Sequence, residues 1–108
     1  MTKLSSKFYP LFEEAGTEFL IRAGQVLYMQ GDRSSNLYLV KSGRVRMFYI
    51  SESGKEITYR IIGEGQLIGE AAFLSHLQQA TISAVTDTAP ITCPIQSLYP
   101  YISKHSEL

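Results

Sequence analysis

The chain has 108 residues, of which 44% are hydrophobic and 19% charged, and its formal net charge at pH 7 is +0. This length suffices for one domain with its own core, and the balanced charge excludes a globally basic surface of the kind that attracts DNA or anionic lipid. A single cysteine, Cys93, and two histidines exclude an internal disulfide framework, a four-cysteine cluster and a multi-histidine metal centre.

A short helix is predicted near the start of the chain, over Ser5–Ala15. This segment opens with serine, carries an early proline and ends before Gly16, a combination typical of helix boundaries. Its aromatic side chains are expected to pack against the body of the domain.

From Thr17 the pattern changes to short runs rich in β-branched and aromatic residues, broken by glycines. Alternation is clearest where Val45, Met47 and Tyr49 share one face of a predicted strand. Short strands without a long helix predict an all-β fold, a double-stranded β-helix or jelly roll with short flanking helices. The predicted strands are Glu18–Ile21, Gln25–Met29, Asn36–Lys41, Arg44–Ile50, Lys55–Ile62, Leu67–Ile68, Thr81–Val85 and Ala89–Pro94.

The stretch from Gly63 to Val85 offers groups suited to an anionic ligand. One helical turn is predicted to open at Gly69-Glu70, and amides at a helix start carry partial positive charge. Glu70 can accept hydrogen bonds from a sugar hydroxyl, and the Thr81 hydroxyl can contact a phosphate oxygen. The simpler reading is that Glu70 only favours a helix first turn and that Thr81 is an ordinary strand residue.

The order of short motifs carries a resemblance. Gly65–Glu70 followed by Thr81–Ala84 resembles the phosphate-binding cassette of cyclic-nucleotide-binding domains, nearest to the sensor domain of CRP/FNR bacterial transcription regulators. The resemblance implies a small-molecule effector, a homodimer in the full-length protein, and DNA binding through a domain outside this chain. Further motifs follow in the family's order: Gly24–Leu27, Gln30–Asp32, Leu37–Val40, Ser42–Val45 and Gly54–Glu56.

One position departs from the family pattern. The family's cyclic-nucleotide binders place an arginine directly before the Ser/Thr, and here that position is Ala80. Arginine grips phosphate through charge-assisted, often bidentate hydrogen bonds. Losing one partner of a buried charged pair costs about 2–5 kcal/mol, which is roughly tens to thousands-fold in affinity. We therefore expect a pocket tuned to an effector other than cyclic AMP, such as a small anionic or apolar metabolite.

Arg60 could supply a different cation. Strand alternation predicts Arg60 on the face of Thr58 and Ile62. There it could bind a carboxylate or phenolate, pair with Glu70 and fill the site, or be a solvated strand arginine. The candidate ligand-binding residues are Gly69, Glu70, Ala71, Ala80, Thr81, Arg60, Ile62 and Met47.

Other residues of this region are assigned by type. Gln78 and Gln79 are expected on a loop surface, and His76 as an exposed loop residue rather than a haem ligand. The apolar residues expected to line the pocket or the core are Met47, Ile61, Ile62, Ile68, Phe73 and Leu74.

Several further expectations concern the whole protein. Neither a catalytic motif, a cofactor site, a membrane-spanning stretch nor a signal peptide is evident, so we expect a non-enzymatic cytoplasmic domain. Residues 1–108 are expected to form one sensor domain of a longer regulator, whose dimerisation helix and helix-turn-helix domain lie outside this chain. The alternatives are a degenerate, ligand-free dimerisation module and the nucleotide-binding domain of a channel or kinase.

Overall fold

The computed structural model describes residues 9–69 and 77–97, without the side chain of Tyr59. The predicted strands are confirmed to within about two residues at most ends, although β1 is shorter than expected and Ile21 forms only an isolated bridge to Thr88. The elements are α1 (Tyr9–Ala15), β1 (Thr17–Glu18), β2 (Val26–Tyr28), β3 (Asn36–Ser42), β4 (Val45–Ile50), β5 (Glu56–Ile62), β6 (Leu67–Ile68), β7 (Thr81–Ala84) and β8 (Ala89–Pro94).

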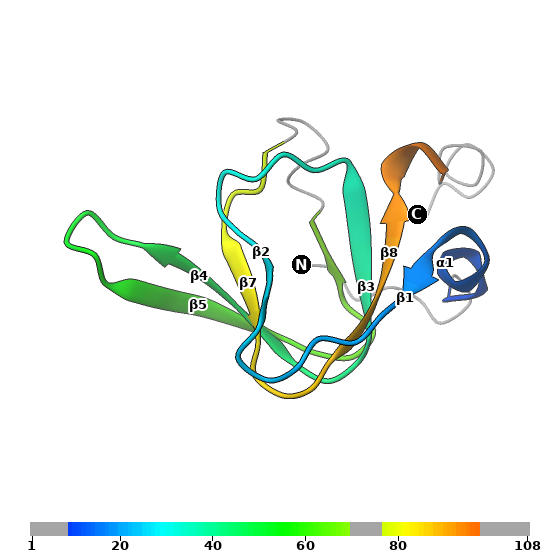
Figure 1. Cartoon of the computed structure of the whole chain (residues 1–108), viewed down its shortest axis with the longest axis horizontal. Coiled ribbons are helices and arrows are strands. Elements are labelled where there is room, and N and C mark those ends of the chain that lie inside the picture. The colour runs from blue at the N-terminus through cyan, green and yellow to red at the C-terminus, as the bar shows by residue number, and fades with distance from the viewer. Residues whose placement is uncertain (1–8, 70–76, 98–108) are drawn as a thin grey trace.

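The strands form two four-stranded antiparallel sheets, ordered β1-β8-β3-β6 and β2-β7-β4-β5 (Figure 1). β1 pairs with β8, β2 with β7, β3 with β6, and β4 with β5, so the first strand of each pair meets a progressively nearer partner in the sequence. A chain paired in this nested way and wound into two layers is a jelly roll, which confirms the predicted fold class.

Alternation along β3 divides the apolar residues between two clusters. Leu37 and Leu39 point to the side covered by α1, where Phe12 is fully buried. Tyr38 and Val40 point to the other sheet. We call the cluster between the sheets the inner cluster; its buried members are Ile21, Tyr28, Val40, Val45, Met47, Ile62, Ile68, Ala80, Ile82 and Ala84.

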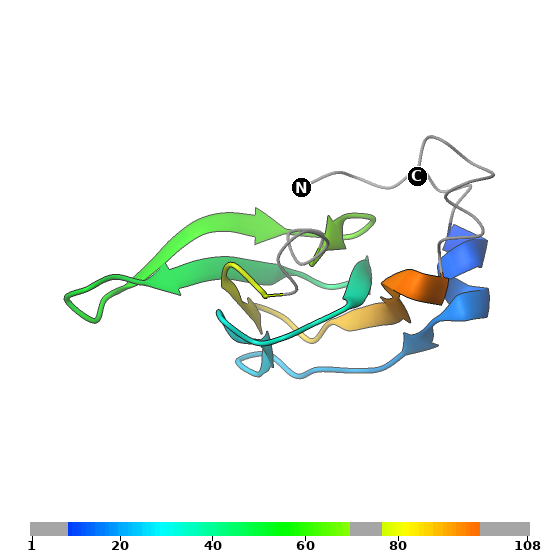
Figure 2. The ribbon, with the colours of Figure 1, turned by 90° about the horizontal axis from the view of Figure 1, so that it is seen from above.

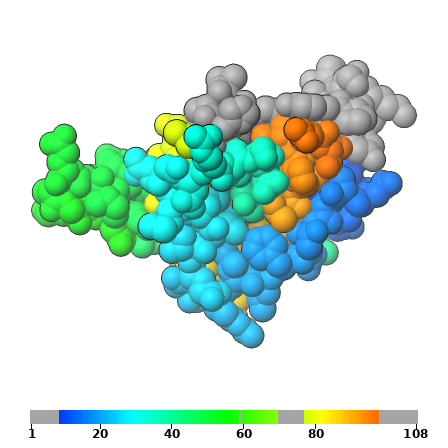
Figure 3. All heavy atoms as spheres, turned by 45° about the horizontal axis from the view of Figure 1, so that its top comes forward, coloured from blue at the N-terminus to red at the C-terminus, as the bar shows by residue number. Residues whose placement is uncertain are grey.

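The hairpin of β4 and β5 projects from the body of the molecule (Figures 1 and 2), whose principal extents are 45 × 28 × 19 Å. In the space-filling view of Figure 3 its tip forms a separate lobe. Two backbone hydrogen bonds close the turn: Ser51 N donates to Lys55 O, and Gly54 N donates to Ser51 O. Away from the body, Ile50 and Ile57 are exposed, since no second layer covers them.

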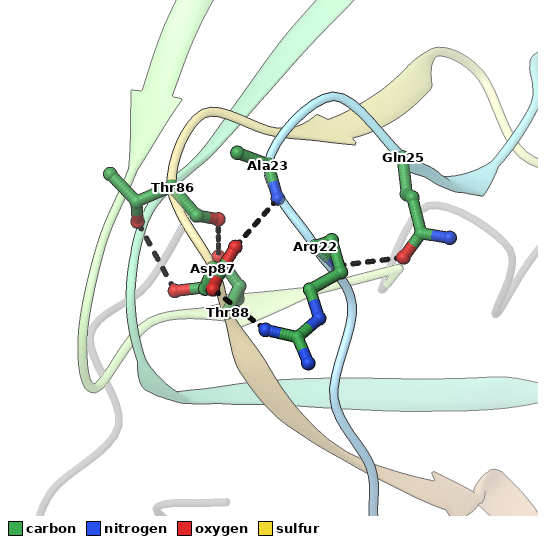
Figure 4. Close-up of polar contacts among 6 residues, drawn as sticks. All are labelled: Arg22, Ala23, Gln25, Thr86, Asp87 and Thr88. Atoms are coloured by element: carbon green, nitrogen blue, oxygen red, sulfur yellow. Dashed lines mark hydrogen bonds and ion pairs between the residues drawn. The ribbon is translucent and has the colours of Figure 1, made fainter.

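A polar corner fixes the loop before β2 to the turn before β8 (Figure 4). The Asp87 carboxylate accepts hydrogen bonds from the Ala23 amide at 2.9 Å and from the Arg22 guanidinium at 3.2 Å. The amide of Ala23 and the charge of Arg22 hold the pKa of this carboxyl below its usual value of 3.8. The Thr88 hydroxyl, buried beside it, lies 2.8 Å from Thr86 O.

Candidate functional site

Ala80, at the position where the resemblance leads us to expect an arginine, is 4% exposed and belongs to the inner cluster. Its neighbours in that cluster include Met47 and Ile82, so its methyl group faces a largely apolar space between the sheets. Burying a cation at this position would cost free energy, because the apolar surroundings would remove its water of hydration. The described structure therefore offers an apolar wall where the family resemblance leads one to expect a phosphate-binding charge.

Thr81 begins β7 and is buried, at 6% exposed. Its hydroxyl oxygen accepts a hydrogen bond from the Gln30 amide at 3.0 Å, which ties the end of the β2 strand region to β7. This hydrogen bond gives Thr81 a structural role that requires no ligand. The hydroxyl proton remains able to donate to an acceptor.

Gly69 is buried and has a φ of +94°, a conformation that glycine adopts without steric cost. A Cβ atom here would lie 3.1 Å from Asn36 O, 3.4 Å from Cδ1 of Tyr38 and 3.7 Å from Nε2 of Gln78. The tight surroundings explain why this position is a glycine. Glu70, Ala71, Phe73, Leu74 and His76 lie outside the described residues, and the expectations about them stay predictions.

The β4–β5 pair contributes further candidate residues to the inner cluster. Met47 is 6% exposed and Ile62 fully buried, and both belong to the inner cluster, which agrees with their expected place in the pocket or the core. Ile61 is 53% exposed, so its expected place in the pocket or core is wrong. Ile61 is paired with Arg46, which puts it on the outer face of the sheet.

Arg60 is paired with Met47 and therefore shares its inward face with Ile62, while its side chain is exposed. The expectation that Thr58 lies on the same face is wrong. Thr58 pairs with Phe48, because the register shifts between Met47 and Phe48 and leaves Tyr59 as an extra residue.

The outward position of Thr58 is independently supported by a side-chain contact. The Arg46 guanidinium donates to Oγ1 of Thr58 at 3.0 Å and covers the Phe48 ring at 4.1 Å. These three side chains therefore lie together on the outer face, whereas Arg60 lies on the face of the inner cluster.

Gln78 is the functional candidate that sequence reasoning missed. It was expected on a loop surface, but its side chain is only 2% exposed; Gln79 is exposed as expected. Backbone hydrogen bonds hold Gln78 under the loop between β2 and β3: Gly31 N donates to Gln78 O, and Gln78 N donates to Asp32 O. Strand alternation gives no signal for this burial, because Gln79 and Ala80 form a bend and β7 begins only at Thr81.

A hollow of about 390 Å³ opens beside this region. The described residues that line it are Arg33, Ser34, Ser35 and Asn36, which lead into β3. Asn36 also supplies the carbonyl next to Gly69. One lining residue of the hollow, Asn36, is therefore also a neighbour of Gly69.

The described ranges 9–69 and 77–97 were also compared with the requirements of a metal site, a membrane-spanning helix and a reactive thiol. No group of three or more His, Cys, Asp or Glu side chains there could hold a metal ion, and no helix there is long and apolar enough to cross a membrane. Cys93 is unpaired and buried among apolar residues, and this burial raises the pKa of its thiol. A raised thiol pKa makes the nucleophilic thiolate scarce.

The two antiparallel sheets and their nested strand pairing define the class of the fold, a jelly-roll domain. The family model described as the cyclic nucleotide-binding domain matches residues 18–105, and the chain belongs to this family. Its similarity to a CRP-type regulator is also seen in three dimensions. The crystal structure of Thermus thermophilus catabolite activator protein matches with a TM-score of 0.81 and 30% identity, over 94% of this chain and 48% of that one.

Two relatives show that similar domains occur in different proteins. The cyclic AMP receptor protein of Thermus thermophilus is 41% identical over 66 residues, which are 60% of this chain and 31% of that protein. Patatin-like phospholipase domain-containing protein 7 of Rattus norvegicus is 35% identical over 79 residues, 72% of this chain but 6% of that protein. The chain therefore spans about a third or less of the length of these relatives.

Proposed function

We propose that this chain is the effector-sensing domain of a CRP-type transcription regulator, with a pocket tuned to an effector other than cyclic AMP. The regulator acts in the cytoplasm as a homodimer and contacts DNA through a part of the protein outside this chain. The similarity to the Thermus regulators supports this assignment. The single cysteine, unpaired and buried, is compatible with a reducing compartment.

The observation that carries the effector assignment is the burial of Ala80 in the inner cluster. An alanine methyl group cannot donate a hydrogen bond or offset the charge of a phosphodiester. Without the cation, the cost of about 2–5 kcal/mol for an unpaired buried charge weakens cyclic AMP binding by roughly tens to thousands-fold.

Regulation follows from differential binding. An effector that contacts one arrangement of the domain better than another shifts the population toward the first. The two arrangements then differ in how the regulator presents its DNA-binding part, which couples effector and DNA affinity reciprocally.

Calorimetric titration with cyclic AMP tests the proposal on the wild type, Ala80→Arg and Ala80→Met. We expect no binding by the wild type, micromolar binding by Ala80→Arg, and none by Ala80→Met, which adds bulk without charge. The Thermus thermophilus cyclic AMP receptor protein serves as the positive control.

Thermal unfolding of each variant shows whether it is folded before titration, because arginine enters a buried position. Micromolar binding of cyclic AMP by the wild type overturns the proposed effector specificity whether or not the arginine variant folds.

A further inference from the structure

The side chain of Gln78 presents a polar atom that is not paired with any of the described residues. Nε2 of Gln78 is buried and has no hydrogen-bond partner within the part of the chain that the structure describes. Buried polar atoms in folded proteins are nearly always paired, because an unpaired donor loses its hydration without compensation. An orphan donor of this kind is therefore a candidate contact for a ligand.

The surroundings of this atom place it at the cassette. Nε2 of Gln78 and Cδ1 of Tyr38 both lie within 4 Å of the point that a Cβ atom of Gly69 would occupy. Asn36, whose carbonyl approaches the same point, lines the hollow of about 390 Å³. Through Gly69, the donor is thus close to Asn36, one of the residues that line this hollow.

A second orphan atom lies on the same face of the roll. Oγ1 of Thr92 is buried and is likewise without a hydrogen-bond partner in the described ranges. Thr92 is directly opposite Tyr38 in the β3–β8 pair, so its side chain is on the inward face with that ring. Two unused polar atoms therefore flank Tyr38, one from β8 and one from the segment before β7.

We propose that Gln78 is a specificity-determining residue of the effector site, whose carboxamide donates a hydrogen bond to an uncharged oxygen acceptor of the ligand. This inference rests on the proposed function and deepens it. The ligand class is a small molecule with a carbonyl, amide, ester or comparable neutral oxygen at the position next to Gly69.

The difference between a glutamine and an arginine side chain explains why an uncharged acceptor is proposed. A carboxamide is neutral, so it compensates the desolvation of a neutral acceptor but leaves a full negative charge unmatched. An arginine fork suits a phosphodiester for the opposite reason. With Ala80 in the inner cluster and Gln78 beside Gly69, the described groups favour an acceptor without charge.

The test compares Gln78→Met with Gln79→Met in the whole 108-residue chain. Gln79 is exposed and its Nε2 already donates to Leu77 O at 3.2 Å, so it is a matched control one residue away. We expect Gln78→Met to raise Tm by about 4–8 °C, since it removes a buried donor that has no partner, and Gln79→Met to leave Tm unchanged. A fall in Tm for Gln78→Met shows that the amide is a structural group and overturns the proposal.

Binding is measured with two probes, cyclic AMP and its neutral methyl phosphotriester, which share base, ribose and a phosphoryl oxygen but differ in charge. We expect the wild type to bind the triester more tightly than cyclic AMP, Gln78→Met to weaken triester binding about 3- to 10-fold, and Gln79→Met to leave it unchanged. Equal triester affinity for wild type and Gln78→Met overturns the contact, as does absence of triester binding by the wild type at millimolar concentration.

The two proposals fail differently. Micromolar binding of cyclic AMP by the wild type overturns the proposed effector specificity, and a preference for cyclic AMP over the triester overturns the uncharged acceptor. Unequal triester binding by wild type and Gln78→Met, with Gln79→Met unchanged, supports the Gln78 contact in either case.

Discussion

Single polar side chains decide how the loops of this domain meet. Asp87 illustrates this, because one carboxylate accepts from the backbone of Ala23 and from the side chain of Arg22, more than sixty positions earlier in the chain. The guanidinium and the carboxylate are largely exposed, so the ion pair itself contributes little in water. The hydrogen bond to the Ala23 amide is the larger cause of the lowered carboxyl pKa.

The stability of this corner should depend on pH. Because the pKa of Asp87 in the folded chain lies below its usual value of 3.8, ionised Asp87 stabilises the fold above that pH. The contribution is lost as the pH falls through the folded-state pKa. We expect Asp87→Ala to lower Tm at pH 7, and the difference from wild type to shrink as the pH falls from 3.8 toward the lower folded-state pKa.

Thermal unfolding monitored by circular dichroism over a pH series measures this difference. Glu52→Gln, in the exposed loop of the β4–β5 hairpin, is the control and should follow the wild-type profile. A Tm difference for Asp87→Ala that stays constant down to the lowest pH would contradict the assignment.

At the scale of elements, turns and one irregular strand set the positions of the site residues. The extra residue in β5 puts Arg60 on the inward face and Thr58 on the outward face, which strict alternation does not allow. Between β3 and β4, Gly43 has a φ of +92°. A Cβ atom there would lie 2.5 Å from Asp87 O and from Oγ1 of Thr88, so the turn packs against the corner of Asp87.

Gly43→Ala should therefore lower the free energy of unfolding more than the same substitution at a glycine in open space. Gly24 has a similar φ of +89° with nothing within 4 Å of a Cβ position, so Gly24→Ala measures the backbone strain alone, about 1–2 kcal/mol. We expect Gly43→Ala to lose a further 1–3 kcal/mol, roughly the cost of overpacking. Urea unfolding of both variants measures the difference, and equal losses would show that the neighbouring turn yields without cost.

At the scale of the whole molecule, the β1-β8-β3-β6 sheet carries apolar clusters on both faces. Phe12 of α1 packs on one face with Leu39 and Ile91, and the inner cluster packs on the other. Since strands β3 and β6 contribute residues to both clusters, loss of one cluster should destabilise the other. The domain should therefore unfold as one cooperative unit.

Phe12→Ala tests this coupling. Removing a fully buried phenylalanine costs about 3–5 kcal/mol, a large part of a typical domain stability of about 5–15 kcal/mol. We expect the methyl NMR signals of Ile62 and Ile82, which report the inner cluster, to disappear at the same lowered urea concentration as the circular dichroism signal. Leu20→Ala, at an exposed position, is the control and should shift neither the NMR nor the circular dichroism transition. Methyl signals of Ile62 and Ile82 that persist to higher urea concentrations than the circular dichroism signal would contradict the coupling.

The sequence by itself determined most of the strands and the jelly-roll class. These depend on local signals: glycines at turns, β-branched runs, and alternation such as Val45 and Met47. It also drew attention to Ala80, because the identity of a residue is read directly from the sequence.

Only the tertiary structure decided which side of the sheet several residues occupy. The bulge at Tyr59 depends on how β5 pairs with β4, and this pairing separates Thr58 from Arg60 and leaves Ile61 exposed. Gln78 is buried because a distant loop at Gly31 and Asp32 binds its backbone. Burial is a property of packing between segments far apart in the chain, and local composition predicts it least well where a polar residue is enclosed.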